Sequence, residues 1–141
     1  MPLDVRLVPH RNLLVATYLG FAGLQETITA SEAISRQPGF HPRMRHLVDL
    51  SGLTGYERDF PGFFAMQARL NESFASVPSE LVIAFVAPSR IAREMAQMAR
   101  RGWDGLDLAI IRIFEDEEKA LGFLGVPETR IAALQERSDQ G

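Results

Sequence analysis

The segment Arg45 to Phe60, RHLVDLSGLTGYERDF, is the part of the chain that decides the predicted fold. The apolar residues of 46–50 predict a short buried strand that ends at an aspartate and a turn. A polar loop over residues 51–60 follows, and an amphipathic helix begins after it. In open α/β folds, ligands and partners bind outside the carboxyl ends of the strands. We therefore expect Asp49 and the loop after it to lie where such a fold usually binds.

Strands and helices are expected to alternate on both sides of this segment. Apolar runs predict further strands at Val5–Val8, Leu13–Leu19, Leu81–Ala87 and Leu108–Phe114. We expect the second of these strands to end at Gly20. Helical spacing with capping residues predicts helices from Leu24, from Asp59 to Val77, after Ser89, from Asp116, whose first turn holds three acidic residues, and over 127–136.

This order predicts an α/β fold with right-handed crossovers and a mostly parallel sheet. The opening hairpin makes the sheet mixed. We expect one domain over residues 1–141, with a core of about 4–125, a five-stranded mixed sheet and four to five helices. The central strands are expected at 46–50, 81–87 and 108–114.

The composition narrows the function classes. The chain has 141 residues, which fits one domain, and 46% of them are hydrophobic, which is enough for a core. A net charge of −3 without a basic stripe argues against nucleic-acid binding. The longest apolar run, Leu81 to Ala87, is too short to span a bilayer. The chain has no cysteine, and its N-terminus does not read as a signal peptide, so we expect a cytoplasmic protein.

No catalytic or cofactor-binding constellation is found. None of the three histidines has a carboxylate or another histidine at metal-ligand spacing. His46, Asp49 and Ser51 could be taken for a triad, but alternation along a strand places His46 and Asp49 on opposite faces. The loop has four residues whose oxygens could bind a divalent cation: Asp49, Ser51, Thr54 and Glu57. Hydrogen bonds within a turn are the simpler reason for such residues in a loop. We therefore expect no enzyme, no metal and no cofactor.

Two segments resemble a known family. Leu47 to Tyr56, LVDLSGLTGY, is similar to the apolar-apolar-Asp-Leu-Ser-Gly-Val-Thr-x-Ile pattern of the STAS domain family of anti-sigma factor antagonists. Phe114 to Leu124, FEDEEKALGFL, resembles the ending of an uncharacterised bacterial SpoIIAA-like group, with Phe123 where that group often has Trp. The resemblance covers about residues 4–125. It implies a STAS-like fold and a partner-facing loop.

The resemblance breaks where the family has its Asp-Ser-Ser-Gly sequence, because this chain has Glu57 to Phe60, ERDF. In the family a partner kinase phosphorylates the first serine of the pair, and the added charge breaks docking. That position is Arg58 here, so the resemblance does not imply the switch. Asp59 offers a fixed negative charge, for which helix capping is the simpler role. The expected contact residues are Asp49, Ser51, Thr54, Tyr56, Arg58, Phe60 and Phe64.

Two functions follow from these observations. The first is a non-enzymatic interaction or regulatory domain that lacks the phosphorylatable serine pair and binds a protein partner or a second copy of itself. For it we expect an apolar patch of Tyr56, Phe60 and Phe64 beside Asp49. The alternative is a carrier of a small apolar ligand, since the fold resembles lipid-transfer domains of the CRAL-TRIO type. Its pocket would be lined by Tyr56, Phe60, Phe63, Phe64 and Met66.

Overall fold

The computed structural model describes residues 3–41, 43–59, 61–62, 65, 81–102 and 109–134. The strands are β1 Leu3–Val8, β2 Leu13–Ala22, β3 Arg45–Tyr56, β4 Leu81–Val86 and β5 Ala109–Phe114. The helices are α1 Leu24–Ser35, α3 Arg90–Gly102 and α4 Glu117–Phe123, with a short 3-10 helix η1 at Pro9–Arg11 and a helical turn at 131–134. Most of the helix predicted over 59–77 lies outside the described residues.

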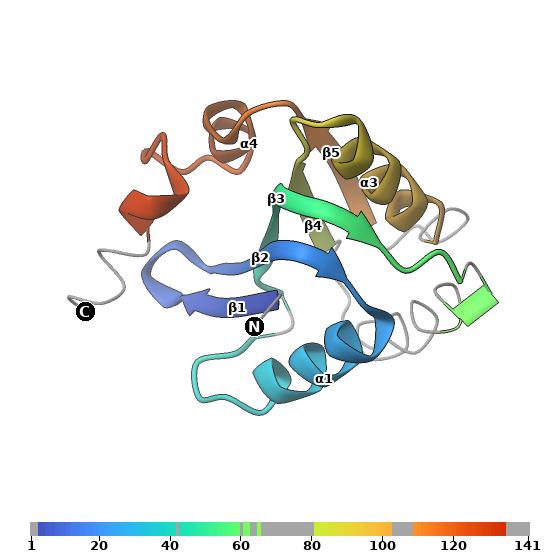
Figure 1. Ribbon diagram of the computed structural model, residues 1–141. Helices are drawn as coiled ribbons and strands as arrows, with labels where there is room; N and C mark the ends of the chain where they lie inside the picture. The colour runs from blue at the N-terminus through green and yellow to red at the C-terminus, as the bar shows by residue number, and fades with distance from the viewer. Residues whose placement is uncertain are drawn as a thin grey trace.

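The five strands form one mixed sheet, as predicted, and their order in it is β1-β2-β3-β4-β5 (Figure 1). β1 and β2 are an antiparallel hairpin, in which Asn12 takes the left-handed conformation at φ 53°. The pairs β2–β3, β3–β4 and β4–β5 are parallel. The mostly parallel α/β fold expected from the alternating pattern is therefore confirmed.

The prediction that 108–114 is a central strand is wrong. Among the described residues β5 pairs with β4 alone and forms an edge of the sheet, whereas β4 lies between β3 and β5. The apolar run of β5 has a different cause. Ile111 joins the core on one face of the sheet, while Phe114 packs against the core on the other. An apolar run thus shows that side chains pack against both faces of the strand. It does not show that the strand has a hydrogen-bonded neighbour strand on each side.

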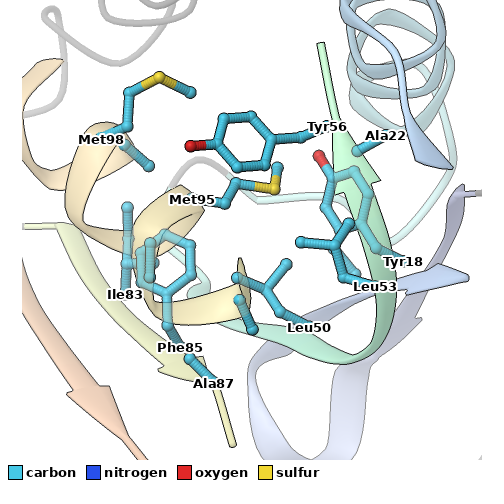
Figure 2. Packing of buried hydrophobic residues seen from close by; sticks show 14 of the residues in the cluster. Tyr18, Ala22, Leu50, Leu53, Tyr56, Ile83, Phe85, Ala87, Met95 and Met98 are labelled. Carbon is cyan, nitrogen blue, oxygen red and sulfur yellow. The ribbon is translucent and has the colours of Figure 1, made fainter. Parts of the chain in front are cut away.

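Helices cover both faces of the sheet. On the α3 face, α1 packs over β1 and α3 packs over β3 and β5, around a cluster that includes Leu50, Phe85 and Met95 (Figure 2). On the α4 face, α4 and the turn at 131–134 pack over the opposite side through Leu47, Leu121 and Leu134. These three leucines are fully or almost fully buried. Alternation along the strands explains how neighbouring residues reach different clusters.

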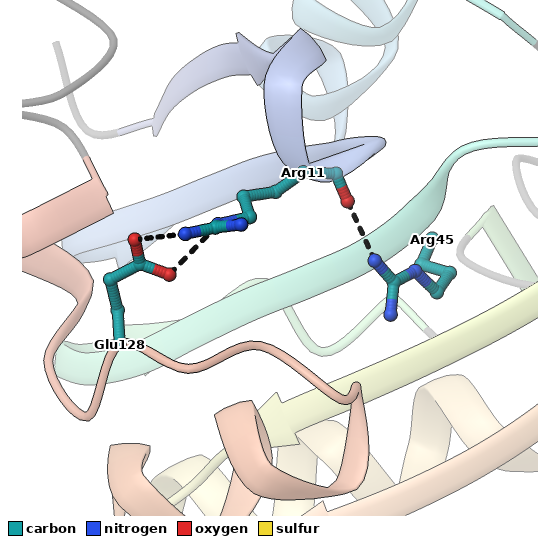
Figure 3. A network of polar contacts seen from close by, with 3 residues as sticks. All are labelled: Arg11, Arg45 and Glu128. Atoms are coloured by element: carbon teal, nitrogen blue, oxygen red, sulfur yellow. Dashed lines mark hydrogen bonds and ion pairs between the residues drawn. The ribbon is translucent and has the colours of Figure 1, made fainter.

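A polar contact fixes the C-terminal segment to the start of the sheet (Figure 3). The guanidinium of Arg11 donates to both carboxylate oxygens of Glu128, at 2.9 Å and 2.8 Å. Arg45 donates to the backbone carbonyl of Arg11 at 2.6 Å. The side chain of Glu128 is 8% exposed, so this bidentate pair is largely removed from water. It joins η1 to the segment that carries Val126 and Ile131 into the α4-face cluster.

Two predicted helix caps are confirmed, and one helix starts a residue later than expected. Asp116, expected in the first turn with Glu117 and Glu118, is instead the cap of α4 and accepts a hydrogen bond from the backbone N–H of Lys119 at 2.8 Å. Ser89 accepts from Ala92 N–H at 3.1 Å before α3. Asp59 accepts from Gly62 N–H at 3.1 Å, which is the capping role favoured over a phosphoserine mimic.

Two predicted strand ends are wrong. β2 does not stop at Gly20, which takes φ 78° and lets the strand continue to Ala22. Residues 51–56, expected as a loop, continue β3. The pairing of the two strands shifts register between Thr17 and Leu19 and again between Gly20 and Phe21. These β-bulges absorb extra residues, and they let the polar segment remain strand.

Candidate functional site

The site lies where β2 and β3 run past the rest of the sheet. β3 pairs with β4 only as far as Asp49, which lies opposite Val86. Beyond that point the described partner of β3 is β2, through Leu19 opposite Gly52 and onward to Ala22 opposite Tyr56. We call residues 17–22 of β2 with residues 49–56 of β3 the end ribbon. It stands at the carboxyl ends of the parallel strands, where folds of this class bind ligands and partners.

The end ribbon carries two exposed apolar side chains. Leu19 is 57% exposed and Phe21 is 56% exposed. Their neighbours Tyr18 and Ala22 belong to the α3-face cluster, so alternation places Leu19 and Phe21 on the α4 face. A large apolar pair in water at the end of a sheet is a feature of binding surfaces.

Two glycines of β3 make room for this pair. A Cβ atom on Gly52 would lie 2.6 Å from Cδ2 of Leu19 and 3.1 Å from the carbonyl oxygen of Tyr18. A Cβ atom on Gly55 would lie 3.3 Å from Cδ2 of Phe21. Both apolar side chains therefore lie across β3 in the space that side chains would fill. The result is a flat apolar surface, since the residues beneath have no side chains.

Three of the predicted contact residues lie between the buried residues of the ribbon. Asp49, Ser51 and Thr54 flank Leu50 and Leu53, which point to the α3 face, and Thr54 falls between the paired residues Leu53 and Gly55, where the register shifts. Oδ1 of Asp49 accepts a hydrogen bond from the backbone N–H of Ser51 at 3.0 Å and another from the Ser51 hydroxyl. Ser51 and Thr54 are exposed. A row of hydrogen-bonding groups therefore runs beside the apolar pair.

Two other predicted contact residues lie elsewhere. Tyr56 is 7% exposed and belongs to the buried cluster that contains Met95 and Met98 (Figure 2). Arg58 holds its guanidinium 5.1 Å from the centre of the Tyr56 ring and lies 3.5 Å from a carboxylate oxygen of Glu94 on α3. Both residues thus connect β3 to α3. An exposed patch that includes Tyr56 is excluded by its burial, and Phe60 and Phe64 lie outside the described residues.

The sequence prediction missed Leu19 and Phe21. The assumption that Gly20 ends the strand hid them, because it cut the alternation that continues through Phe21 to Ala22. A signal was present: Tyr18 and Ala22 are four residues apart, and two apolar residues with a glycine lie between them. A glycine inside a strand pattern often marks a bulge, after which the strand resumes.

His46 stands on the opposite face of β3 from Asp49, as strand alternation predicts. It is partly buried, and desolvation lowers the pKa of its imidazole to about 4. The hydroxyl of Ser51 meets Asp49 instead. Within the described ranges, no three His, Cys, Asp or Glu side chains are grouped to hold a metal ion. The chemistry that the end ribbon offers is apolar contact and hydrogen bonding.

The apolar-carrier alternative stays a prediction. Of the five residues expected to line its pocket, Tyr56 is packed in the core and the others lie outside the described part of the chain. One open hollow of about 610 Å³ lies at the β1 edge and is lined by residues 5–7, 9–10 and 37–38. It includes Arg6, His10 and Gln37, so its wall is mixed in polarity. In the described chain, no helix combines the length and apolar character needed to cross a membrane.

Comparison with known proteins finds similarity in structure but not in sequence. No protein-family model and no curated protein sequence matches the chain. The chain is similar in structure to an uncharacterized protein of the DUF3478 family with a SpoIIAA-like fold from Shewanella loihica PV-4. The two are 14% identical with a TM-score of 0.49, over 86% of this chain and 91% of the other. The fold described above rests on the strand order and register of this chain itself.

Proposed function

We propose that this protein is a non-enzymatic interaction domain of the STAS type, which binds a protein through the α4 face of its end ribbon. The observation that carries the proposal is the exposed pair Leu19 and Phe21, lying flat over Gly52 and Gly55. Covering two half-exposed side chains of this size stabilises a complex by about 1 kcal/mol each. Asp49, Ser51 and Thr54 beside them supply the polar rim that gives an interface its orientation.

The proposal also accounts for the residues that differ from the STAS pattern. Arg58 stands where the family has its phosphorylated serine, and it contacts Tyr56 and Glu94 within the same chain. Residues Glu57, Arg58 and Asp59 have no hydroxyl to phosphorylate. We therefore expect binding that does not depend on phosphorylation at this segment.

The test is quantitative affinity purification from native cells with tagged wild-type protein and a Leu19→Ser, Phe21→Ser variant. Both substitutions are at exposed positions, so the variant should keep its circular dichroism spectrum and nearly its melting temperature. We expect one or more proteins to be recovered with the wild type and reduced at least about tenfold with the variant.

A control variant changes an exposed side chain elsewhere on the surface. Gln97 is exposed on α3, and Gln97→Ser should leave recovery unchanged. Equal recovery of every protein with the wild type and the end-ribbon variant would remove the proposal. A bound small apolar molecule that is lost from neither protein would point to the carrier alternative.

A further inference from the structure

The α4 face of the sheet is covered over only part of its length. α4 and the turn at 131–134 bury Val8, Leu13 and Leu47, which lie at the hairpin end of the sheet and near the start of β3. Further along the same strands, Leu19, Phe21 and Thr54 are exposed. Parallel strands are normally covered on both faces. Among the described residues the face thus forms a step, with a helical layer over one half and an exposed ledge over the other.

We propose that a second copy of this chain covers the ledge, with the two end ribbons packed face to face about a two-fold axis near Leu19. This inference rests on the proposed function and names the partner of the same surface. A two-fold contact requires a patch that complements itself. Both the shape and the polar pattern of the ledge meet that requirement.

The shape argument concerns the step. Suppose that the two end ribbons pack antiparallel. The part of each sheet that lies under α4 and the turn at 131–134 is then past the Ala22 and Tyr56 end of the other copy's ribbon. The two α4 layers are then kept apart, and each ledge fills the step of the other copy. The flat surface that Leu19 and Phe21 form over Gly52 and Gly55 allows the two sheets to approach at the usual spacing of about 10 Å.

The polar argument concerns the row along β3. Asp49 lies level with Thr17, and Gly55 lies level with Phe21, so both lie two positions along β2 from Leu19. A two-fold axis at Leu19 places the level of Asp49 in one copy opposite the level of Gly55 in the other. It brings the Asp49 carboxylate of one copy toward the Thr54 hydroxyl of the other, which pairs an acceptor with a donor.

The charges beside the ledge are also compatible with a second copy. Asp4 and Arg6 of β1 share the α4 face with Val8 and alternate with Leu3, Val5 and Leu7, and their side chains form an ion pair at 2.8 Å. This pair is close to neutral, and Asp49 does not face its own symmetry mate in the antiparallel arrangement. Two copies can therefore approach without opposing like charges.

The ledge is about two strands wide and about 20 Å long, which is small compared with the roughly 800 Å² per partner of a stable complex. We therefore expect a weak dimer with a Kd on the order of 10–100 µM. Sedimentation equilibrium of the full chain over about 1 µM to 1 mM covers this range. Wild-type protein should change from monomer to dimer across it.

Phe21→Asp should weaken self-association at least about tenfold, because it places a carboxylate in the centre of the contact. Gln97→Asp adds the same charge on α3 and should have no effect. Thermal melts of both variants confirm that they are folded. If Phe21→Asp fails to fold, Thr54→Asp supplies the same test at an exposed position.

Two substitutions at position 54 should change the affinity of the dimer in opposite directions. Thr54→Asp should weaken the dimer by repulsion from Asp49 of the second copy, and Thr54→Lys should strengthen it. In an Asp49→Asn background, which keeps an oxygen to cap Ser51, the difference between the two variants should shrink to less than about twofold.

Two outcomes would overturn the inference: a wild-type monomer at every concentration, or a dimer that Phe21→Asp and the position-54 variants leave unchanged. Neither outcome alone removes the proposed function. If affinity purification still recovers a different protein through Leu19 and Phe21, the ledge binds that protein and the second-copy inference alone fails. If recovery is also unchanged, both fail.

Discussion

Single glycines shape the surface to which we assign the function. Gly52 allows the side chain of Leu19 to lie across β3, because a Cβ atom there would be 2.6 Å from Cδ2 of Leu19. The same Cβ atom would be 3.1 Å from the backbone oxygen of Tyr18, which cannot turn away as a side chain can. The flat part of the end ribbon thus depends on the absence of one methyl group.

Gly52→Ala should reduce the free energy of unfolding by about 1–3 kcal/mol, as overpacking does. It should also increase the exposure of Leu19. Gly122→Ala is the matched control, because a Cβ atom there meets nothing within 4 Å and the site is helical. Urea denaturation of the two variants gives the comparison. An equal unfolding midpoint for Gly52→Ala and wild type would show that the end ribbon accommodates a Cβ atom at position 52 without strain.

His46 gives the fold a predictable pH dependence. Its pKa is about 4 in the folded chain, compared with 6.5 for an unperturbed histidine, because burial disfavours the charged imidazole. The unfolded chain therefore binds more protons between these values, and stability falls as the pH falls from about 6.5 to about 4. The shift corresponds to a loss of up to about 3 kcal/mol.

His46→Gln removes this titration while other groups still titrate. The measurement is the unfolding free energy of both proteins at several pH values between about 7 and 4. The wild type should lose more stability on acidification than the variant, and the difference should grow through this window. Parallel curves would mean that the imidazole is well solvated in the folded chain.

At the scale of elements, hydrophobic periodicity and capping residues predict where helices and strands lie. They do not predict the length of a strand when that length depends on pairing with a distant strand. The ends of α3 and α4 follow from Ser89 and Asp116, because a capping side chain acts on its own neighbours. The length of β3 does not, since residues 51–56 look like a polar loop until β2 supplies hydrogen-bond partners. The candidate site divides in the same way. The position of Asp49, Ser51 and Thr54 near a strand end could be predicted from the sequence, whereas that of Leu19 and Phe21 depends on β2 continuing past Gly20 to Ala22.

The short helix α4 should depend strongly on its cap. It has seven residues, and Asp116 accepts from Lys119 N–H at its start. Asp116→Ala should cost about 1 kcal/mol of stability, while Asp116→Asn keeps an oxygen acceptor and should cost much less. Thermal melts of the two variants test this. Equal losses would show that charge near the helix end matters more than the hydrogen bond.

At the scale of the whole molecule, the C-terminal segment completes the α4-face cluster. Val126, Ile131 and Leu134 lie in that cluster, and Glu128 ties their segment to Arg11 through two hydrogen bonds. The contact spans 117 positions in the sequence, so local pattern alone could not reveal it. It holds a covering element over the start of the sheet, and this element does not reach Leu19 and Phe21, which are exposed.

Glu128→Gln should lower the melting temperature by roughly 3–6 °C, because it removes the charge from a bidentate and largely buried pair. Arg130→Gln, in the same segment, removes only an ion pair with Glu117 whose arginine is 80% exposed, and should change the melting temperature little. Differential scanning calorimetry of the two variants decides. A similar, small change for both would mean that apolar packing alone holds the segment.

The central claim is that the α4 face of the end ribbon meets another protein. Photo-crosslinking in native cells tests it most directly, with a photoreactive phenylalanine derivative placed at position 21 and, as a control, at exposed position 97 on α3. We predict a defined crosslinked product from position 21, either with a second copy or with a different protein, and none of comparable yield from position 97. Crosslinking no stronger at position 21 than at position 97 would contradict the claim.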